Sequence, residues 1–109
     1  MPEKGSQGTR RVLIVEDSQN WRDLLPSVFK GIETVVVKSA KEAEEALKKG
    51  GFTEIVTDGL GGDWTQVVEK SGGLPVKLLS GDVRHKHLAI EKGVKFLDKG
   101  TFDINELLK

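Results

Sequence analysis

Carboxylate, hydroxyl and ammonium side chains follow four of the short apolar runs in this sequence. These side chains belong to Glu16, Asp17, Asp58, Ser80 and Lys99. Carboxylates held close together repel one another, and a hard divalent cation such as Mg²⁺ relieves that repulsion with few protein oxygens and several waters. A carboxylate can also accept a phosphoryl group, while an ammonium and a hydroxyl beside it share the charge of the PO₃ unit. The residue types therefore predict magnesium-dependent phosphoryl chemistry, provided that the fold brings them together.

The elements expected to position these residues are short strands that alternate with helices. Apolar and β-branched runs predict five strands, at residues 11–16, 33–37, 54–58, 75–79 and 94–97. A helical pattern follows each run, so we expect an α/β fold in which a parallel sheet has helices on both faces. The runs are almost continuously apolar, which is typical of parallel strands that are buried on both faces. Ligands bind beyond the carboxyl ends of such strands, which is where the five polar side chains stand.

Apolar spacing and capping residues predict the helices. The first helix has one apolar stripe, formed by Trp21, Leu24, Leu25, Val28 and Phe29. Ser39 and Glu42 form a capping box at the start of the second helix. Residues 59–62 are expected to be a loop, after which Asp63 caps a short third helix. Asp82 is expected to cap a weakly amphipathic fourth helix, and a short fifth helix follows the last strand.

Charge and composition exclude several classes of protein. The 109 residues include 17 basic and 17 acidic side chains and no cysteine, which excludes disulfides, thiolate zinc sites and cysteine nucleophiles. Three basic side chains against one acidic one give residues 1–11 a formal charge of +2, so the remaining body carries −2. That body lacks the basic face of a nucleic-acid binder. No apolar run is long enough to span a membrane and no apolar leader is visible, so we expect a cytoplasmic location.

Four segments of the chain resemble, in order, the motifs of the receiver domain of bacterial two-component signalling, the CheY-like response-regulator fold. The segments are residues 12–17 (VLIVED), 55–58 (IVTD), 78–81 (LLSG) and 96–99 (FLDK). Each motif is weak alone, but the four are specific together because each stands at a predicted strand end. The resemblance covers residues 11–109, and residues 1–10 are expected to be a flexible tail. It implies a doubly wound, flavodoxin-like sheet of five parallel strands in the order 2-1-3-4-5.

The resemblance also implies a role for each polar side chain. Asp58 would accept a phosphoryl group from a histidine kinase or a histidine phosphotransfer protein. Glu16 and Asp17 would hold Mg²⁺ directly or through water, and Asp58 and the backbone carbonyl of Leu60 would complete the metal site. The phosphoryl oxygens would be contacted by two further side chains, those of Ser80 and Lys99.

Two aromatic residues carry implied roles in switching and docking. Phe96 would move together with Ser80 as the switch pair, and Trp21 would be presented to the kinase. The residues by themselves leave a simpler interpretation open for both rings. In it, Phe96 is only a residue of the hydrophobic core, and Trp21 is a partly buried residue that packs against its neighbours. His85 and His87 are two positions apart on a predicted helix, so they do not share a face and predict no metal site.

The predicted function is that of a phosphoacceptor in a two-component phosphorelay. We expect a monomer or weak dimer that binds neither nucleic acid nor membranes and does no enzymatic chemistry beyond its own phosphorylation and dephosphorylation. The chain departs from the family pattern in the loop Gly59-Leu60-Gly61-Gly62 and at Gly100, where a proline is usual. One alternative is a pseudo-receiver that binds partners without phosphorylation. Another is a phosphatase with an aspartyl nucleophile, although Leu60 stands where such enzymes usually have a second Asp.

Overall fold

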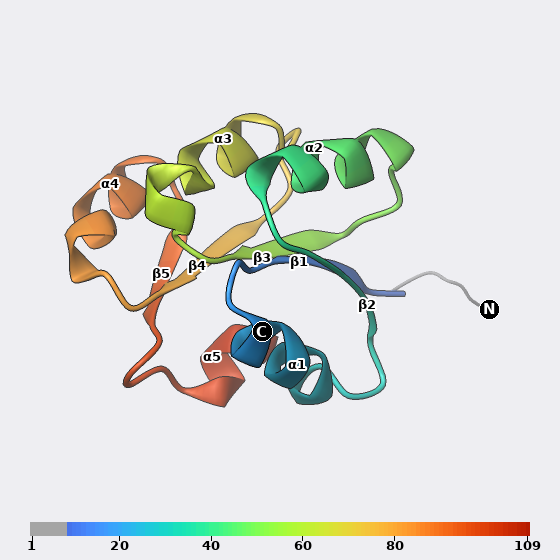
Figure 1. The fold of residues 1–109 in the computed structure, drawn as a ribbon, viewed down its shortest axis with the longest axis horizontal. Helices are drawn as coiled ribbons and strands as arrows, with labels where there is room; N and C mark the ends of the chain where they lie inside the picture. Colours follow the sequence, from blue (N-terminus) through green and yellow to red (C-terminus); the bar gives the residue numbers. More distant parts are fainter. Residues whose placement is uncertain (1–8) are drawn as a thin grey trace.

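Strand β3 (Glu54–Thr57) lies at the centre of a five-stranded parallel sheet. The computed structural model describes residues 9–109, and its strands follow the order β2-β1-β3-β4-β5 (Figure 1). The other strands are β1 (Arg11–Val15), β2 (Glu33–Val37), β4 (Val76–Ser80) and β5 (Lys95–Asp98). The predicted fold class and strand order are therefore confirmed.

Helices cover both faces of this sheet (Figure 1). One face carries α1 (Gln19–Val28) and α5 (Ile104–Leu108). The other face carries α2 (Ala40–Lys49), α3 (Trp64–Glu69) and α4 (Lys86–Glu91). Two 3₁₀ turns, η1 (Leu60–Gly62) and η2 (Val83–His85), precede α3 and α4.

Alternating side chains of β1 supply the cores on the two faces. Leu13 and Val15 pack with residues of α2, α3 and α4. Val12 and Ile14 point the other way and pack with residues of α1 and α5. Successive side chains of a strand point to opposite faces, so a run that is apolar throughout is buried on both sides. This arrangement fixes the carboxyl end of β1 inside the molecule, where the acidic residues follow.

Two of the predicted caps are present. The Ser39 hydroxyl accepts a hydrogen bond from the Glu42 backbone N–H at 3.1 Å, as the capping box requires. The Glu42 carboxylate in return accepts a hydrogen bond from the backbone N–H of Lys38. In a capping box the usual donor is the N–H of the N-cap residue, which here is Ser39. The Asp82 carboxylate accepts from the Arg84 N–H and begins the fourth helical segment, which is divided into η2 and α4.

Three local predictions are wrong. Leu24 was expected on the buried stripe of the first helix, but it is 50% exposed. The buried face of α1 is instead centred on Leu25 and Phe29, and Leu24 is rotated by about 100° from Leu25 around the helix. Asp63 makes no capping bond because its own backbone is already helical. Residues 59–62 are not an open loop, since they contain the turn η1.

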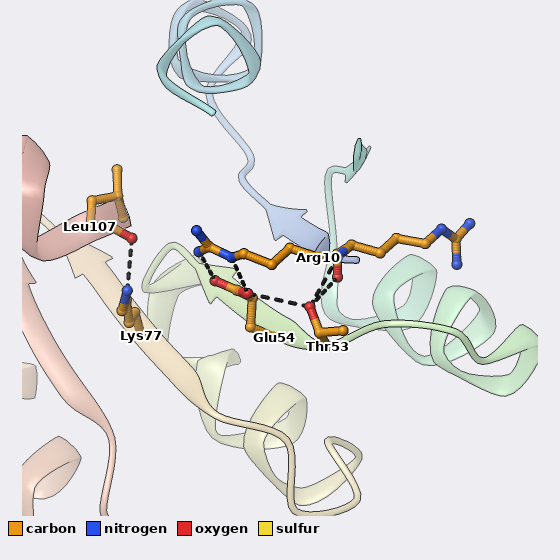
Figure 2. Close-up of polar contacts among 6 residues, drawn as sticks. Arg10, Thr53, Glu54, Lys77 and Leu107 are labelled. Atoms are coloured by element: carbon orange, nitrogen blue, oxygen red, sulfur yellow. Dashed lines mark hydrogen bonds and ion pairs between the residues drawn. The ribbon is translucent and has the colours of Figure 1, made fainter. Parts of the chain in front are cut away.

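The amino edge of the sheet carries its own polar contacts, shown in Figure 2. The Arg10 guanidinium donates to the Glu54 carboxylate at 2.9 Å, which ties the start of β1 to the start of β3. Lys77 of β4 donates from Nζ to the Leu107 carbonyl of α5 at 2.7 Å. The predicted flexible tail falls largely on residues 1–8, which lie outside the described residues. Among residues 9–109, no helix is both long and apolar enough to cross a membrane.

Candidate functional site

Three carboxylates meet at the carboxyl edge of the sheet. Glu16 and Asp17 follow β1, and Asp58 follows β3; one oxygen from each lies within 4.8 Å of the others. The strands are paired with Val15 opposite Thr57, so the residues that come next are neighbours. The Asp58 N–H extends the pairing by donating to the Val15 carbonyl at 2.7 Å. Glu16 is buried and Asp17 is exposed, so the cluster is open to solvent on the Asp17 side.

Lys99 brings a positive charge into this cluster. Its Nζ lies 2.9 Å from Oε1 of Glu16 and 2.9 Å from Oδ1 of Asp58. The backbone positions this side chain, because Ser80 of β4 stands opposite Asp98 of β5 and the Lys99 N–H donates to the Ser80 carbonyl at 3.0 Å. With all three carboxylates ionised and one ammonium among them, the cluster still has an excess of negative charge.

The Ser80 hydroxyl lies beside the segment that follows Asp58. Its Oγ accepts from the Asp82 N–H at 3.0 Å, so the side chain also caps the turn after β4. A Cβ placed on Gly59 would lie 3.0 Å from this Oγ, tighter than nine in ten real contacts of a Cβ atom. Because Gly59 has no Cβ, the Ser80 side chain can pack directly against the loop that carries Asp58.

The electrostatics of the cluster distinguish its three acids. Burial raises the pKa of Glu16, against the opposing effect of Lys99. The hydrogen bond that Asp17 shares with Asp58 raises the pKa of Asp17. Burial also acts to raise the pKa of Asp58, but the hydrogen bonds from Lys99 and Asp17 outweigh it and the pKa falls below its usual range. Asp58 is therefore the carboxylate of the three whose ionised form the cluster favours.

The donor set fits a hard divalent cation. Three carboxylate oxygens in one open cluster, with an uncompensated negative charge, are the ligands that Mg²⁺ prefers. The predicted fourth ligand, the Leu60 carbonyl, accepts a hydrogen bond from the Asp63 N–H at 3.1 Å and retains one lone pair. Leu60 also has a φ of 54°, a left-handed conformation that non-glycine residues seldom adopt. The metal role of the Leu60 carbonyl stays a prediction.

The two aromatic residues with implied roles both make contacts inside the molecule. Phe96 is half-buried and packs against the core on the face of α2, α3 and α4. Trp21, in the first turn of α1, is half-buried with its ring over the Lys99 ammonium. The sequence did not predict the contact between the Trp21 ring and the Lys99 ammonium, although Trp21 stands only four positions after Asp17.

His85 is a further residue near the site that the sequence did not indicate. Its ring lies 6.0 Å from the Trp64 ring, and its Nε2 is 3.3 Å from the Asp82 carboxylate. A Cβ on Gly59 would lie 3.2 Å from the imidazole, so the ring packs against the loop after Asp58. The sequence placed His85 on a regular helix, whereas the 3₁₀ turn η2 directs it inward. No sequence signal separates these two outcomes.

Comparison with family models and with curated proteins finds no match. Solved structures, by contrast, share the whole architecture. The beryllofluoride-activated NtrC4 receiver domain dimer matches with 29% identity and a TM-score of 0.74, covering 90% of this chain and 89% of that one. The receiver domain of the Francisella response regulator 1452 matches with 24% identity, a TM-score of 0.77 and coverage of 91% and 90%. A CheY-like receiver domain protein from Methanospirillum hungatei matches with 20% identity, a TM-score of 0.78 and coverage of 93% and 89%.

The chain is thus a doubly wound α/β protein with an acidic cluster at the carboxyl edge of its parallel sheet. The chain has the fold of the CheY-like receiver domains of response regulators, which confirms the predicted resemblance to that fold. This fold supports a role in two-component signal transduction.

Proposed function

We propose that this chain is the phosphoacceptor receiver domain of a two-component phosphorelay and that Asp58 carries the phosphoryl group. The observation that carries the proposal is the position of Lys99 Nζ, which lies 2.9 Å from both Glu16 and Asp58 at the ligand-binding edge of the sheet. A structural ion pair would need one carboxylate, whereas here one ammonium serves a cluster of three.

The chemistry begins with the ionised Asp58 carboxylate. One of its oxygens attacks the phosphorus of a phosphohistidine, the P–N bond breaks, and the imidazole nitrogen keeps the bonding electron pair and takes up a proton. Asp58 becomes an aspartyl phosphate. Lys99 then pairs with the phosphoryl oxygens, because the carboxylate it had faced now carries them, and the Ser80 hydroxyl donates a hydrogen bond from β4.

Glu16, Asp17 and Asp58 are the side chains that would hold Mg²⁺, with the Leu60 carbonyl as a backbone ligand. When bound, Mg²⁺ supplies positive charge that offsets both the acidic cluster and the incoming phosphoryl oxygens. Asp17 is the exposed member of the set, so its side of the cluster is the one open to solvent.

The implied phosphoryl donor is a histidine kinase or a histidine phosphotransfer protein in the cytoplasm. The domain serves as a switch whose partner binding changes with phosphorylation, rather than as an enzyme acting on other substrates. The phosphatase alternative has no second aspartate at position 60, where the chain has Leu60.

Incubation with acetyl phosphate and Mg²⁺, followed by intact mass measurement, tests the proposal. We expect one added phosphoryl group on the natural chain, none on Asp58→Asn, and none after chelation of the metal. Asp63→Asn is the matched control, because Asp63 is an exposed aspartate in the following turn. Equal phosphorylation of Asp58→Asn would refute the assignment, and a chain that gains no mass at all would favour the pseudo-receiver.

A further inference from the structure

The face of the Trp21 indole covers the ammonium of Lys99. Nζ lies 4.8 Å from the centroid of the ring, within the distance at which the negative face of an aromatic ring attracts a cation. The same nitrogen is 2.9 Å from Glu16 and from Asp58. Lys99 therefore has three partners, two of them charged and one of them aromatic.

The ring of Trp21 is itself held in place. It packs against the core on the face of the sheet that α1 and α5 cover, and its centroid lies 6.2 Å from that of Phe102 at an interplanar angle of 50°. Phe102 belongs to the segment between β5 and α5, only three positions after Lys99. The ring and the ammonium that it covers are thus fixed by the same part of the chain.

We propose that Trp21 is a positioning residue that keeps the Lys99 ammonium over the site during phosphoryl transfer. The consequence for catalysis rests on the function proposed above. Glu16 and Asp58 are also the side chains that would hold the metal and accept the phosphoryl group, so neither is a constant partner for Lys99. The attraction of the indole face does not depend on how those carboxylates are engaged. Trp21 restrains a flexible four-carbon side chain at the stage when its ionic partners change.

This role differs from the kinase docking that the family resemblance implies for Trp21. Docking affects only transfer from a protein donor. Positioning also affects transfer from a small donor such as acetyl phosphate, because it acts on Lys99 within the domain. The two roles are therefore separated by the choice of donor.

The first test is the rate of phosphorylation by acetyl phosphate in Trp21→Leu and Trp21→Phe. Leucine removes the π face, and phenylalanine keeps a weaker one. We expect the maximal rate to fall about twofold to thirtyfold in Trp21→Leu, the range of a partly desolvated cation–π contact, with substantial recovery in Trp21→Phe. The donor concentration at half-maximal rate should change much less. A Trp21→Leu protein that is folded by thermal melting and is phosphorylated at the natural rate overturns the proposal, as does a defect confined to a protein donor.

The second test needs no phosphoryl transfer. The chain has two tryptophans, so Trp64→Phe leaves Trp21 as the only indole fluorophore. In that background Lys99→Met removes the ammonium from the ring, and we expect a shift in the emission maximum and intensity of Trp21. Lys92→Met, a change at an exposed lysine, is the matched control and should leave the emission unchanged. If emission is the same with and without Lys99, the contact does not exist and the proposal fails.

The two tests distinguish this inference from the proposed function. If the natural chain gains no phosphoryl group while Lys99→Met shifts the emission, the contact is present but the proposed function fails, and with it the catalytic role of Trp21. If the chain is phosphorylated but Trp21→Leu is unimpaired, only the positioning role fails.

Discussion

The ammonium of Lys99 lies 2.9 Å from Oε1 of Glu16, a carboxylate whose side chain is only 1% exposed. Removing the partner of a buried carboxylate lowers the free energy of unfolding by more than the intact pair contributes to it, because the remaining charge is left desolvated. Lys99 therefore stabilises the fold in addition to the role proposed for it in phosphoryl transfer, and this leads to the first prediction.

Lys99→Met should lower the free energy of unfolding by about 1–3 kcal/mol in the absence of divalent ions. Adding Glu16→Gln to Lys99→Met should restore part of the loss, because the buried charge is then gone. Urea denaturation of the two single variants and the double variant measures the coupling between the residues. Additive losses would show that the two side chains do not interact, and Lys92→Met should stay within about 0.5 kcal/mol of the natural chain.

Asp17→Asn should raise the melting temperature of the metal-free protein. The folded-state pKa of Asp17 is raised, chiefly by its hydrogen bond with Asp58, so its ionised form destabilises the folded state at any pH above that pKa. Solvent screening at this exposed position limits the gain to less than about 1 kcal/mol, or a few degrees.

Millimolar Mg²⁺ should stabilise the natural chain and have much less effect on Asp17→Asn. Thermal melts with magnesium and with chelator give the comparison. A melting temperature that does not respond to magnesium in the natural chain would contradict a shared acidic metal site.

Gly59→Ala should destabilise the protein and slow phosphorylation. The new Cβ would lie 3.0 Å from the Ser80 hydroxyl and 3.2 Å from the His85 ring, so at least one of them must shift. Overpacking of this kind costs about 1–3 kcal/mol. Gly81→Ala is the control, because a Cβ there meets no atom within 4 Å. Similar behaviour of the two alanine variants would show that the crowding at Gly59 has no consequence.

Glu54→Gln should reduce stability at neutral pH but not in acid. The hydrogen bond from Arg10 lowers the pKa of Glu54 in the folded state. A lowered carboxylate pKa contributes stability above the unfolded pKa of about 4.3, and this contribution is lost as the pH falls through the folded-state pKa. Urea denaturation at pH 7 should show a loss of about 1 kcal/mol that shrinks in strong acid. A loss of the same size at both pH values would mean that the carboxylate charge is not responsible.

Residues 82–93 should exchange their amide hydrogens faster than α1 and α2. The only buried residue of α4 is Ala89, whereas Val83, Leu88 and Ile90 are 59%, 41% and 63% exposed. Few buried contacts give a low free energy of local opening. Beryllofluoride with magnesium, a mimic of the phosphoryl group, should slow this exchange because the Ser80 hydroxyl caps the turn that begins the segment. Strong protection without the mimic, unchanged when it is added, would contradict a role for this segment in switching.

The fold class, the five strands and the edge of the sheet at which the polar residues meet could all be predicted from the amino-acid sequence. Apolar runs and helical spacing locate the elements, and parallel strands necessarily present their carboxyl ends at one edge. Glu16, Asp17, Asp58 and Lys99 were predicted to converge for that reason, and the geometry brings them within contact distance.

The pairing of side chains from different elements could not be predicted and depends on how the elements pack together. The indole of Trp21 over Lys99 and the imidazole of His85 against the loop after Asp58 depend on how α1 and η2 sit on the sheet. The exposure of Leu24 has the same origin, because the rotation of α1 selects Leu25 for the core. Periodicity and capping describe a segment with respect to its own axis. The orientation of that axis against its neighbours comes from packing between distant parts of the chain, which no local pattern records.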